Sequence, residues 1–270
     1  MKIALVDSGL GLLAAAAAVR RLRPDADLVL SSDPDGMPWG PRSPQDVTQR
    51  ALAAARAAAA HRPDVLVVAC NTASVHALPA LRAALEPRLP VVGTVPAVKP
   101  AAEGGGRVAI WATPATTGSA YQRGLIADFA GGADVTEVPC PGLADAVQHA
   151  DDTAIDTAVA AAAARTPAGT RAVVLGCTHY ELVADRIRAA VQPDGRAPLA
   201  LYGSAGAVAA QALRRIGAPP APPERVRRDR GLPPAPGRVT VLLSGRPAAL
   251  PAPALAYPEG RLLAAVAPVA

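Results

Sequence analysis

The chain has 270 residues, 51% of them hydrophobic and 3% aromatic, and a formal net charge of +5. This length favours one large domain or two small ones, and the core must be built mainly from alanine, valine and leucine. The basic residues are scattered along helical stretches and form no stripe, which argues against nucleic-acid binding. No uninterrupted apolar run is long enough to predict a membrane span, so we expect neither nucleic acid nor membrane as a partner.

The three cysteines, Cys70, Cys140 and Cys177, are far apart in the sequence. An odd number of cysteines, in a chain that opens directly on a strand-like segment without a signal peptide, predicts a cytoplasmic protein with free thiols. The sequence has no Cys-x-x-Cys or His-x-x-x-His spacing, so we expect no zinc site.

The first part of the chain alternates between strand-like and helix-like segments. Ser43 followed by Pro44 is a typical helix start, and Arg20 with Arg21 suits a helix end. In chain order, the composition predicts a strand at 2–6, a helix at 10–22, a strand at 27–33, a Pro- and Gly-rich loop at 34–44, a helix at 44–60, a strand at 65–69, a helix from about 74 to 85 and a strand within 90–96.

After a glycine-rich break at 104–106, the segment 107–111 repeats the opening design of a basic residue, apolar residues and a small polar turn. The remaining predicted elements are a strand at 172–176, a helix at 205–216, a surface loop at 217–237 that is rich in Pro and Arg, and a last strand at 238–244. The recurrence indicates a duplicated α/β unit. We therefore predict two pseudo-symmetric α/β domains with mainly parallel sheets that face each other across a cleft, one formed by 1–94 with 204–270 and the other by 95–203.

Two stretches carry the clearest functional signal. Residues 65–74 and 172–180 are each an apolar run that stops at a cysteine, Cys70 or Cys177, followed by hydroxyl or amide side chains. Such runs are typical of strands buried on both faces of a parallel sheet, and chemistry gathers beyond the carboxyl ends of these strands. Backbone N–H groups at a following helix start would favour the thiolate.

Two thiols on opposite sides of a cleft could invert a stereocentre without a cofactor. One thiolate would take a proton from carbon while the other thiol delivers a proton to the opposite face, provided that water is excluded. Asp7 and His179, each next to a predicted strand end, could act on the thiols as a base and an acid.

Other interpretations remain open at this point. A lone cysteine in an apolar strand is often a small buried hydrophobe, which is how we interpret Cys140. Gly9-x-Gly11-x-x-Ala14 with Asp33 after the next strand fits a dinucleotide site, but it leaves both cysteine stretches unexplained. A cysteine nucleophile with a histidine partner and a non-catalytic binding module are further alternatives.

Five motifs, taken together, resemble the signature of the glutamate racemases in the aspartate/glutamate racemase family. In order and spacing they are Asp7-Ser8-Gly9-Leu10-Gly11, Pro38-Trp39-Gly40, Cys70-Asn71-Thr72-Ala73-Ser74, Ala112-Thr113-Pro114-Ala115-Thr116 and Gly176-Cys177-Thr178-His179-Tyr180. The resemblance covers residues 1 to about 216. It implies a cofactor-independent isomerase that interconverts L- and D-glutamate for peptidoglycan synthesis, with the active site between two α/β domains, often in a homodimer.

The resemblance also implies roles for individual residues. Cys70 would be the base for the D-enantiomer and Cys177 the base for the L-enantiomer, assisted by Asp7 and His179. The residues that would hold the substrate's carboxylate and ammonium groups, beside Asp7 and His179, are Ser8, Trp39, Gly40, Asn71, Thr72, Thr116 and Thr178.

Several positions depart from the family pattern. They are Leu12 for a glycine, Trp39 for a tyrosine, Gln148 for an assisting glutamate, Glu181 for a proline, and Gly203-Ser204 for Asp-Ser. We expect the first three to touch the cleft or its wall. They leave the pair of thiols intact, but they keep aspartate or another amino acid open as the alternative substrate.

Overall fold

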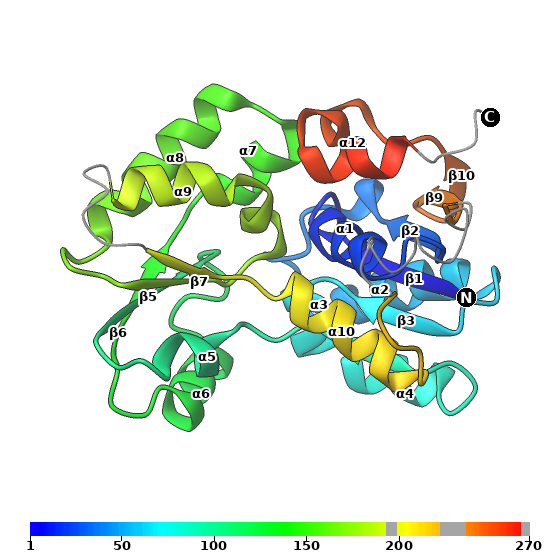
Figure 1. Cartoon of the computed structure of the whole chain (residues 1–270), viewed down its shortest axis with the longest axis horizontal. Helices are drawn as coiled ribbons and strands as arrows, with labels where there is room; N and C mark the ends of the chain where they lie inside the picture. The colour runs from blue at the N-terminus through cyan, green and yellow to red at the C-terminus, as the bar shows by residue number, and fades with distance from the viewer. Residues whose placement is uncertain (193–198, 222–235, 266–270) are drawn as a thin grey trace, which may run out of the picture.

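The structure, a computed structural model, describes residues 1–192, 199–221 and 236–265. Part of the Pro- and Arg-rich segment predicted as a loop therefore lies outside the described residues. Two sheets organise the chain, and Figure 1 shows them side by side with helices packed around each. One is six-stranded in the order β10-β9-β2-β1-β3-β4, and the other is four-stranded in the order β6-β5-β7-β8. All pairings are parallel except that of β10 with β9.

The strands are β1 (Lys2–Asp7), β2 (Asp27–Ser32), β3 (Val65–Val68), β4 (Val91–Gly93), β5 (Arg107–Ala112), β6 (Asp134–Pro139), β7 (Ala172–Leu175), β8 (Ala200–Tyr202), β9 (Val239–Leu243) and β10 (Arg246–Ala248). The α-helices are α1 (Leu12–Leu22), α2 (Pro44–Ala59), α3 (Asn71–His76), α4 (Leu78–Leu85), α5 (Val98–Ala102), α6 (Ala120–Phe129), α7 (Leu143–His149), α8 (Asp152–Arg165), α9 (Ala184–Val191), α10 (Ala205–Arg215) and α12 (Pro258–Ala264). Short 3₁₀ turns are η1 (Pro34–Gly36), η2 (Thr178–Val183) and η3 (Ala252–Ala256).

The apolar strands form the centre of each sheet. Every residue of β3 and β7 is buried, because helices cover both faces of a parallel sheet and leave no exposed side for polar residues. The predicted α/β class with two mainly parallel sheets is confirmed. The boundaries at 94/95 and 203/204 stay a prediction, which sheet membership supports: β1–β4 and β9–β10 form one sheet, and β5–β8 form the other.

The helix predicted from about 74 to 85 is wrong in its start and in its continuity. Helix α3 begins at Asn71, directly after Cys70, and a separate helix α4 follows Ala77. Pro79, near the start of α4, lacks the N–H that a continuous helix would need and its ring crowds the preceding turn. As a consequence, Cys70 occupies the N-cap position of α3, and the residues that follow it present their first-turn backbone N–H groups near its sulfur.

The other sequence predictions differ less from the structure. Helix α1 begins at Leu12, two residues later than expected, and Ser43 caps α2 by accepting a hydrogen bond from the Asp46 N–H at 3.2 Å. The strand predicted at 238–244 is β9, but β10 and α12 follow it and were not predicted. Helix α12 packs against α1 (Figure 1), and the Tyr257 hydroxyl donates a 2.6 Å hydrogen bond to the Val147 carbonyl on α7. The C-terminal segment thus contacts both α1, which packs on the six-stranded sheet, and α7, which follows β6 of the four-stranded sheet.

Candidate active site

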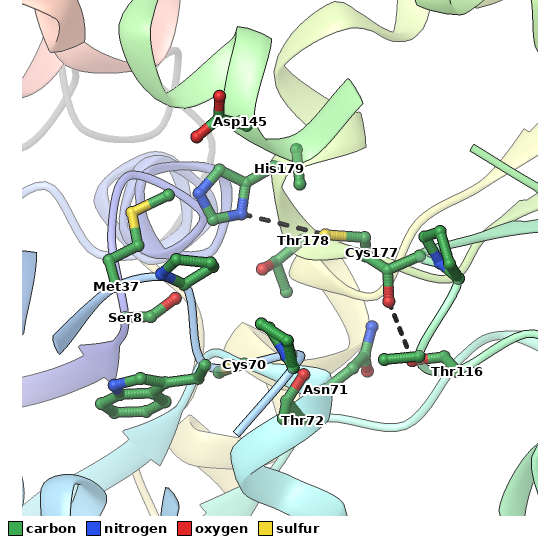
Figure 2. A pocket seen from close by; sticks show the side chains of 18 of the residues that line it. Ser8, Met37, Cys70, Asn71, Thr72, Thr116, Asp145, Cys177, Thr178 and His179 are labelled. Atoms are coloured by element: carbon green, nitrogen blue, oxygen red, sulfur yellow. Dashed lines mark hydrogen bonds between the residues drawn. The ribbon is translucent and has the colours of Figure 1, made fainter. Parts of the chain in front are cut away.

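A cavity of about 310 Å³ lies where the carboxyl ends of strands from both sheets meet. Its lining comes from the segments after β1, β3, β5, β6 and β7, together with the loop that contains Trp39. All the residues assigned to the site from the sequence line it, namely Asp7, Ser8, Trp39, Gly40, Cys70, Asn71, Thr72, Thr116, Cys177, Thr178 and His179. Figure 2 shows Cys70 and Thr72 entering from one side and Cys177 and Thr116 from another.

The cavity also has lining residues that were not assigned to the site from the sequence. Those among them with a sulfur atom or a charged side chain are Met37, Cys140 and Asp145. Cys140 follows the end of β6, just as the other two cysteines follow the ends of β3 and β7. This strand was not recognised from the sequence because prolines stand on both sides of Cys140. Met37 and Asp145 carry no sequence signal beyond their closeness to Trp39 and Gln148.

Burial favours the protonated form of both Cys70 and Cys177. Burial raises the pKa of the Cys70 thiol well above its usual value, and the nearby Asp7 carboxyl raises it further. Burial likewise raises the pKa of Cys177 to about 12. Backbone N–H groups at the start of α3 and η2 lower both pKa values only in part. The expected effect of the backbone N–H groups, which favours the thiolate, is therefore present but smaller than the effect of desolvation.

Asp7 and His179 are each placed beside one thiol. Burial raises the pKa of Asp7 to about 7, although contacts with the Cys70 thiol and Ser8 oppose this shift. Burial lowers the pKa of His179 to about 4, so the ring is neutral at neutral pH. Its Nδ1 lies 3.8 Å from Cys177 Sγ (Figure 2). Each thiol thus has its own group with which it can exchange a proton.

The absence of a side chain on Gly11 allows these groups to converge. A Cβ on this glycine would stand 2.3 Å from Thr178 Oγ1, 2.4 Å from Asp7 Oδ2 and 2.8 Å from His179 Nδ1. Groups from both sheets therefore fill the space around the glycine turn where a pyrophosphate would bind. This crowding argues against the dinucleotide alternative.

The Trp39 wall of the cavity is fixed by Asp33. The indole Nε1 donates a 3.1 Å hydrogen bond to Asp33 Oδ2, which also accepts one from Arg50 at 3.2 Å, and Ser244 Oγ donates to Asp33 Oδ1 at 3.2 Å. Both carboxylate oxygens of Asp33 thus accept hydrogen bonds from other side chains of the protein, so Asp33 is not available to bind a ribose. Of the departures expected at the cleft, Trp39 lines the cavity, whereas the Leu12 side chain is buried in the apolar core and does not.

Polar side chains of the lining can hold a small zwitterion. Asn71 donates from Nδ2 to the Gly176 carbonyl at 2.8 Å, which ties α3 to the end of β7, and its buried Oδ1 has no hydrogen-bond partner among the described residues. Among the residues that the structure describes, no Lys or Arg lines the cavity. Carboxylates of a ligand must therefore be bound by hydroxyl groups and backbone N–H groups, which bind anions well when they point at one spot.

Two classes of site find no support in the described part of the chain. No group of three or more His, Cys, Asp and Glu residues there could hold a metal ion. None of the helices in residues 1–192, 199–221 and 236–265 is both long enough and apolar enough to cross a membrane.

The comparison with known families agrees with this arrangement. The profile of the Asp/Glu/hydantoin racemase family matches residues 11–212. The chain belongs to this family. It is 42% identical over 202 residues to the glutamate racemase of Roseiflexus sp. (strain RS-1), and the aligned region covers 71% of this chain and 72% of that protein. It is 35% identical over 220 residues to the glutamate racemase of Pseudomonas entomophila (strain L48), and that aligned region covers 80% of this chain and 81% of the relative.

Solved structures extend the similarity to the fold. Escherichia coli glutamate racemase, crystallised with L-glutamate and the activator UDP-MurNAc-ala, matches with a TM-score of 0.71 and 32% identity over 82% of this chain and 84% of that one. The enzyme of Thermus thermophilus, in complex with beta-chloro-D-alanine, has a TM-score of 0.64 and 28% identity over 90% and 87%. The predictions of the family, of the fold class and of an amino-acid racemase, an isomerase, are confirmed.

Two of the departures from the family pattern are physically coupled. Glu181 on η2 accepts hydrogen bonds from the Ser204 N–H at 2.8 Å, the Ser204 hydroxyl at 3.0 Å and the Ala205 N–H at 3.2 Å. Its carboxylate thereby caps α10 in place of an N-cap side chain. A Cβ on Gly203 would stand 2.3 Å from Glu181 Oε2, so the glutamate requires a glycine at this position.

We expect Gly203→Ala to destabilise the protein by about 1–3 kcal/mol, because the added methyl group overpacks against the Glu181 carboxylate. In a Glu181→Ala background the same change has room and its effect is smaller. Urea unfolding of the two single variants and the double variant measures this coupling. Additive effects would show that the two positions are independent.

We expect Asp7→Asn to stabilise the protein more at high pH than at low pH. Because burial raises the pKa of Asp7 from 3.8 to about 7, the folded state holds this proton more tightly than the unfolded state does. The stability linked to it is complete below about pH 4, declines as the pH rises and is lost above about pH 7. Removing the charge then gains on the order of 4 kcal/mol at pH 8.

Thermal unfolding of Asp7→Asn and the wild type at pH 5 and pH 8 checks this expectation. The exposed Asp128 provides the matched control, since Asp128→Asn removes a solvated carboxylate. A melting-temperature difference that is the same at both pH values would contradict the raised pKa of Asp7.

Proposed function

We propose that this protein interconverts L- and D-glutamate by proton transfer through Cys70 and Cys177, and that it supplies D-glutamate for peptidoglycan in the cytoplasm. The observation that carries the proposal is that both thiols line one cavity, and that each has a neighbour with which it can exchange a proton, Asp7 for Cys70 and His179 for Cys177. The relatives named above are glutamate racemases, which favours glutamate over aspartate as the substrate.

The reaction from the L-enantiomer begins at Cys177. Its S–H bond breaks as a proton passes to Nδ1 of His179, which leaves a thiolate beside an imidazolium. The thiolate takes the α-proton of the substrate, and the Cys70 thiol gives its proton to the opposite face of the same carbon. The protonated Asp7 then returns a proton to the Cys70 thiolate, so each transferred proton has a donor and an acceptor within the site.

The substrate itself supplies the charge that this transfer needs. The pKa values of Cys177 and His179, about 12 and about 4, make charge separation between these two groups alone unfavourable. An ammonium group beside the thiolate stabilises the anion and lowers the pKa of the thiol. Water exclusion strengthens this interaction. The arrangement therefore favours proton transfer only when an amino acid fills the cavity.

The remaining roles follow from the cavity lining. Ser8, Thr72, Thr116, Thr178 and the backbone at Gly40 would hold the two carboxylates, and Asn71 Oδ1 and Asp7 would hold the ammonium group. We propose no cofactor and a homodimeric assembly, as the family resemblance implies.

The purified protein should exchange the α-proton of glutamate with solvent deuterium, without added pyridoxal phosphate or metal ions. Proton NMR of each enantiomer in deuterated water measures the exchange. Aspartate is the parallel substrate: exchange with aspartate and not with glutamate would reject glutamate in favour of the alternative.

Replacing either thiol should abolish racemisation, because each face of the carbon then lacks its acid or base. We expect Cys70→Ser and Cys177→Ser each to lower kcat by at least about 10²-fold, as polarimetry of glutamate would record. Cys140→Ala is the control, since this buried cysteine takes no part in the proposed transfer. Full activity in either serine variant would remove that thiol from the mechanism.

A further inference from the structure

Gln148, on α7, contacts the candidate active site from behind the cavity wall. Its Oε1 accepts a 2.8 Å hydrogen bond from the backbone N–H of Leu10 and lies 3.2 Å from Nε2 of His179. Leu10 belongs to the turn after β1, whereas His179 follows β7. The amide of Gln148 therefore connects two catalytic segments that come from different sheets.

The Leu10 N–H determines which end of the Gln148 amide faces the histidine. A backbone N–H can only donate, so the side-chain atom that it meets must be the amide oxygen and not the amide nitrogen. The same oxygen faces Nε2 of His179. Since this oxygen can only accept, the hydrogen bond requires that Nε2 carries the ring proton.

The proton on Nε2 leaves the other ring nitrogen bare. In a neutral imidazole one nitrogen is protonated and the other is an acceptor, and burial keeps His179 neutral at neutral pH. Nδ1 of His179, 3.8 Å from Cys177 Sγ, then presents a lone pair to the thiol. We propose that Gln148 is a positioning residue that fixes the His179 tautomer able to accept the Cys177 proton; its catalytic meaning rests on the proposed function.

The amide has a second consequence that a carboxylate would not share. The other titratable side chains that line the cavity with His179 are Cys177 on its own segment, Asp7 at the end of β1, Cys70 after β3, Cys140 after β6 and Asp145 on α7. A further carboxylate at residue 148 would stabilise the imidazolium and raise the pKa of His179. The neutral glutamine selects the tautomer without adding charge.

Gly9 leaves the space that the Gln148 amide occupies. A Cβ on Gly9 would stand 2.2 Å from Gln148 Oε1 and 2.8 Å from Met37 Sδ. Gly9→Ala therefore displaces the amide without changing its chemistry, and it offers a second route to the same interaction.

The test is ¹⁵N NMR of protein labelled in its histidines, in which the chemical shifts of the two ring nitrogens tell a protonated nitrogen from a bare one. The chain has four histidines, and the signals lost in His179→Asn assign the relevant pair. We expect Nε2 of His179 to be protonated and Nδ1 to be bare at pH 7. In Gln148→Leu, which removes the acceptor, and in Gly9→Ala, the preference should be lost.

Gln148→Glu keeps the acceptor and adds a charge, so it should keep the Nε2-protonated tautomer and raise the pH midpoint of the His179 titration. This variant keeps the test decisive if Gln148→Leu fails to fold. A wild-type ring protonated on Nδ1, an unchanged tautomer in Gln148→Leu, or an unchanged titration in Gln148→Glu would each overturn the proposal.

Activity provides the second readout. Gln148→Leu should lower kcat at least about tenfold while KM changes little, since a catalytic imidazole in the wrong tautomer loses up to about 10⁴-fold in rate. Gln211→Leu is the matched control, because Gln211 is exposed on α10 and bonds only to Arg214 among the described residues. The NMR result does not depend on racemisation. A wild type that holds the tautomer but exchanges no glutamate would therefore reject the proposed function alone.

Discussion

Desolvation of a few titratable side chains between the two sheets is the constraint on which the site depends. Asp7, Cys70 and His179 are all buried, and burial shifts each group towards its uncharged form. The parallel strands bring these residues together, because their carboxyl ends meet at one cavity. The same burial that favours the uncharged forms lets the charges of a bound amino acid act strongly on the thiols.

On the two sides of the cavity, the thiols have chemically different groups with which they can exchange a proton. Cys70 is beside a carboxyl group whose pKa is raised to about 7, and Cys177 is beside an imidazole whose pKa is lowered to about 4. A carboxyl near neutrality can both give and take a proton, whereas the neutral imidazole can only accept one through its bare nitrogen. The imidazole side therefore depends on its tautomer, and the carboxyl side does not.

Local sequence patterns were sufficient for the central strands and for the position of both thiols, but not for β6, β8 and β10. An apolar run that ends in Cys-Asn-Thr or Cys-Thr-His predicts a strand buried on both faces of a parallel sheet, and β3 and β7 bear this out. The charge state of the thiols was not predictable in this way, because it depends on how far desolvation exceeds the effect of nearby N–H groups. The break between α3 and α4 had a local signal, Pro79, but the short helix before it lacks a periodic pattern of its own. The Glu181–Gly203 coupling joins residues far apart in the sequence, and only the folded chain shows it.

The departures from the family pattern change the contacts that hold the site's segments in place more than they change the residues proposed to react. Glu181 caps α10, Gln148 contacts His179 from behind the cavity wall, and Trp39 is held by Asp33 on the protein side. The hydroxyl and amide groups that would meet the substrate, by contrast, follow the family motifs without change. A shorter substrate such as aspartate would require those anion-binding groups to move closer to the thiols. Of these departures only Trp39 lines the cavity, whereas Glu181 and Gln148 act through contacts behind the lining, so the departures leave the proposed anion-binding groups themselves unchanged.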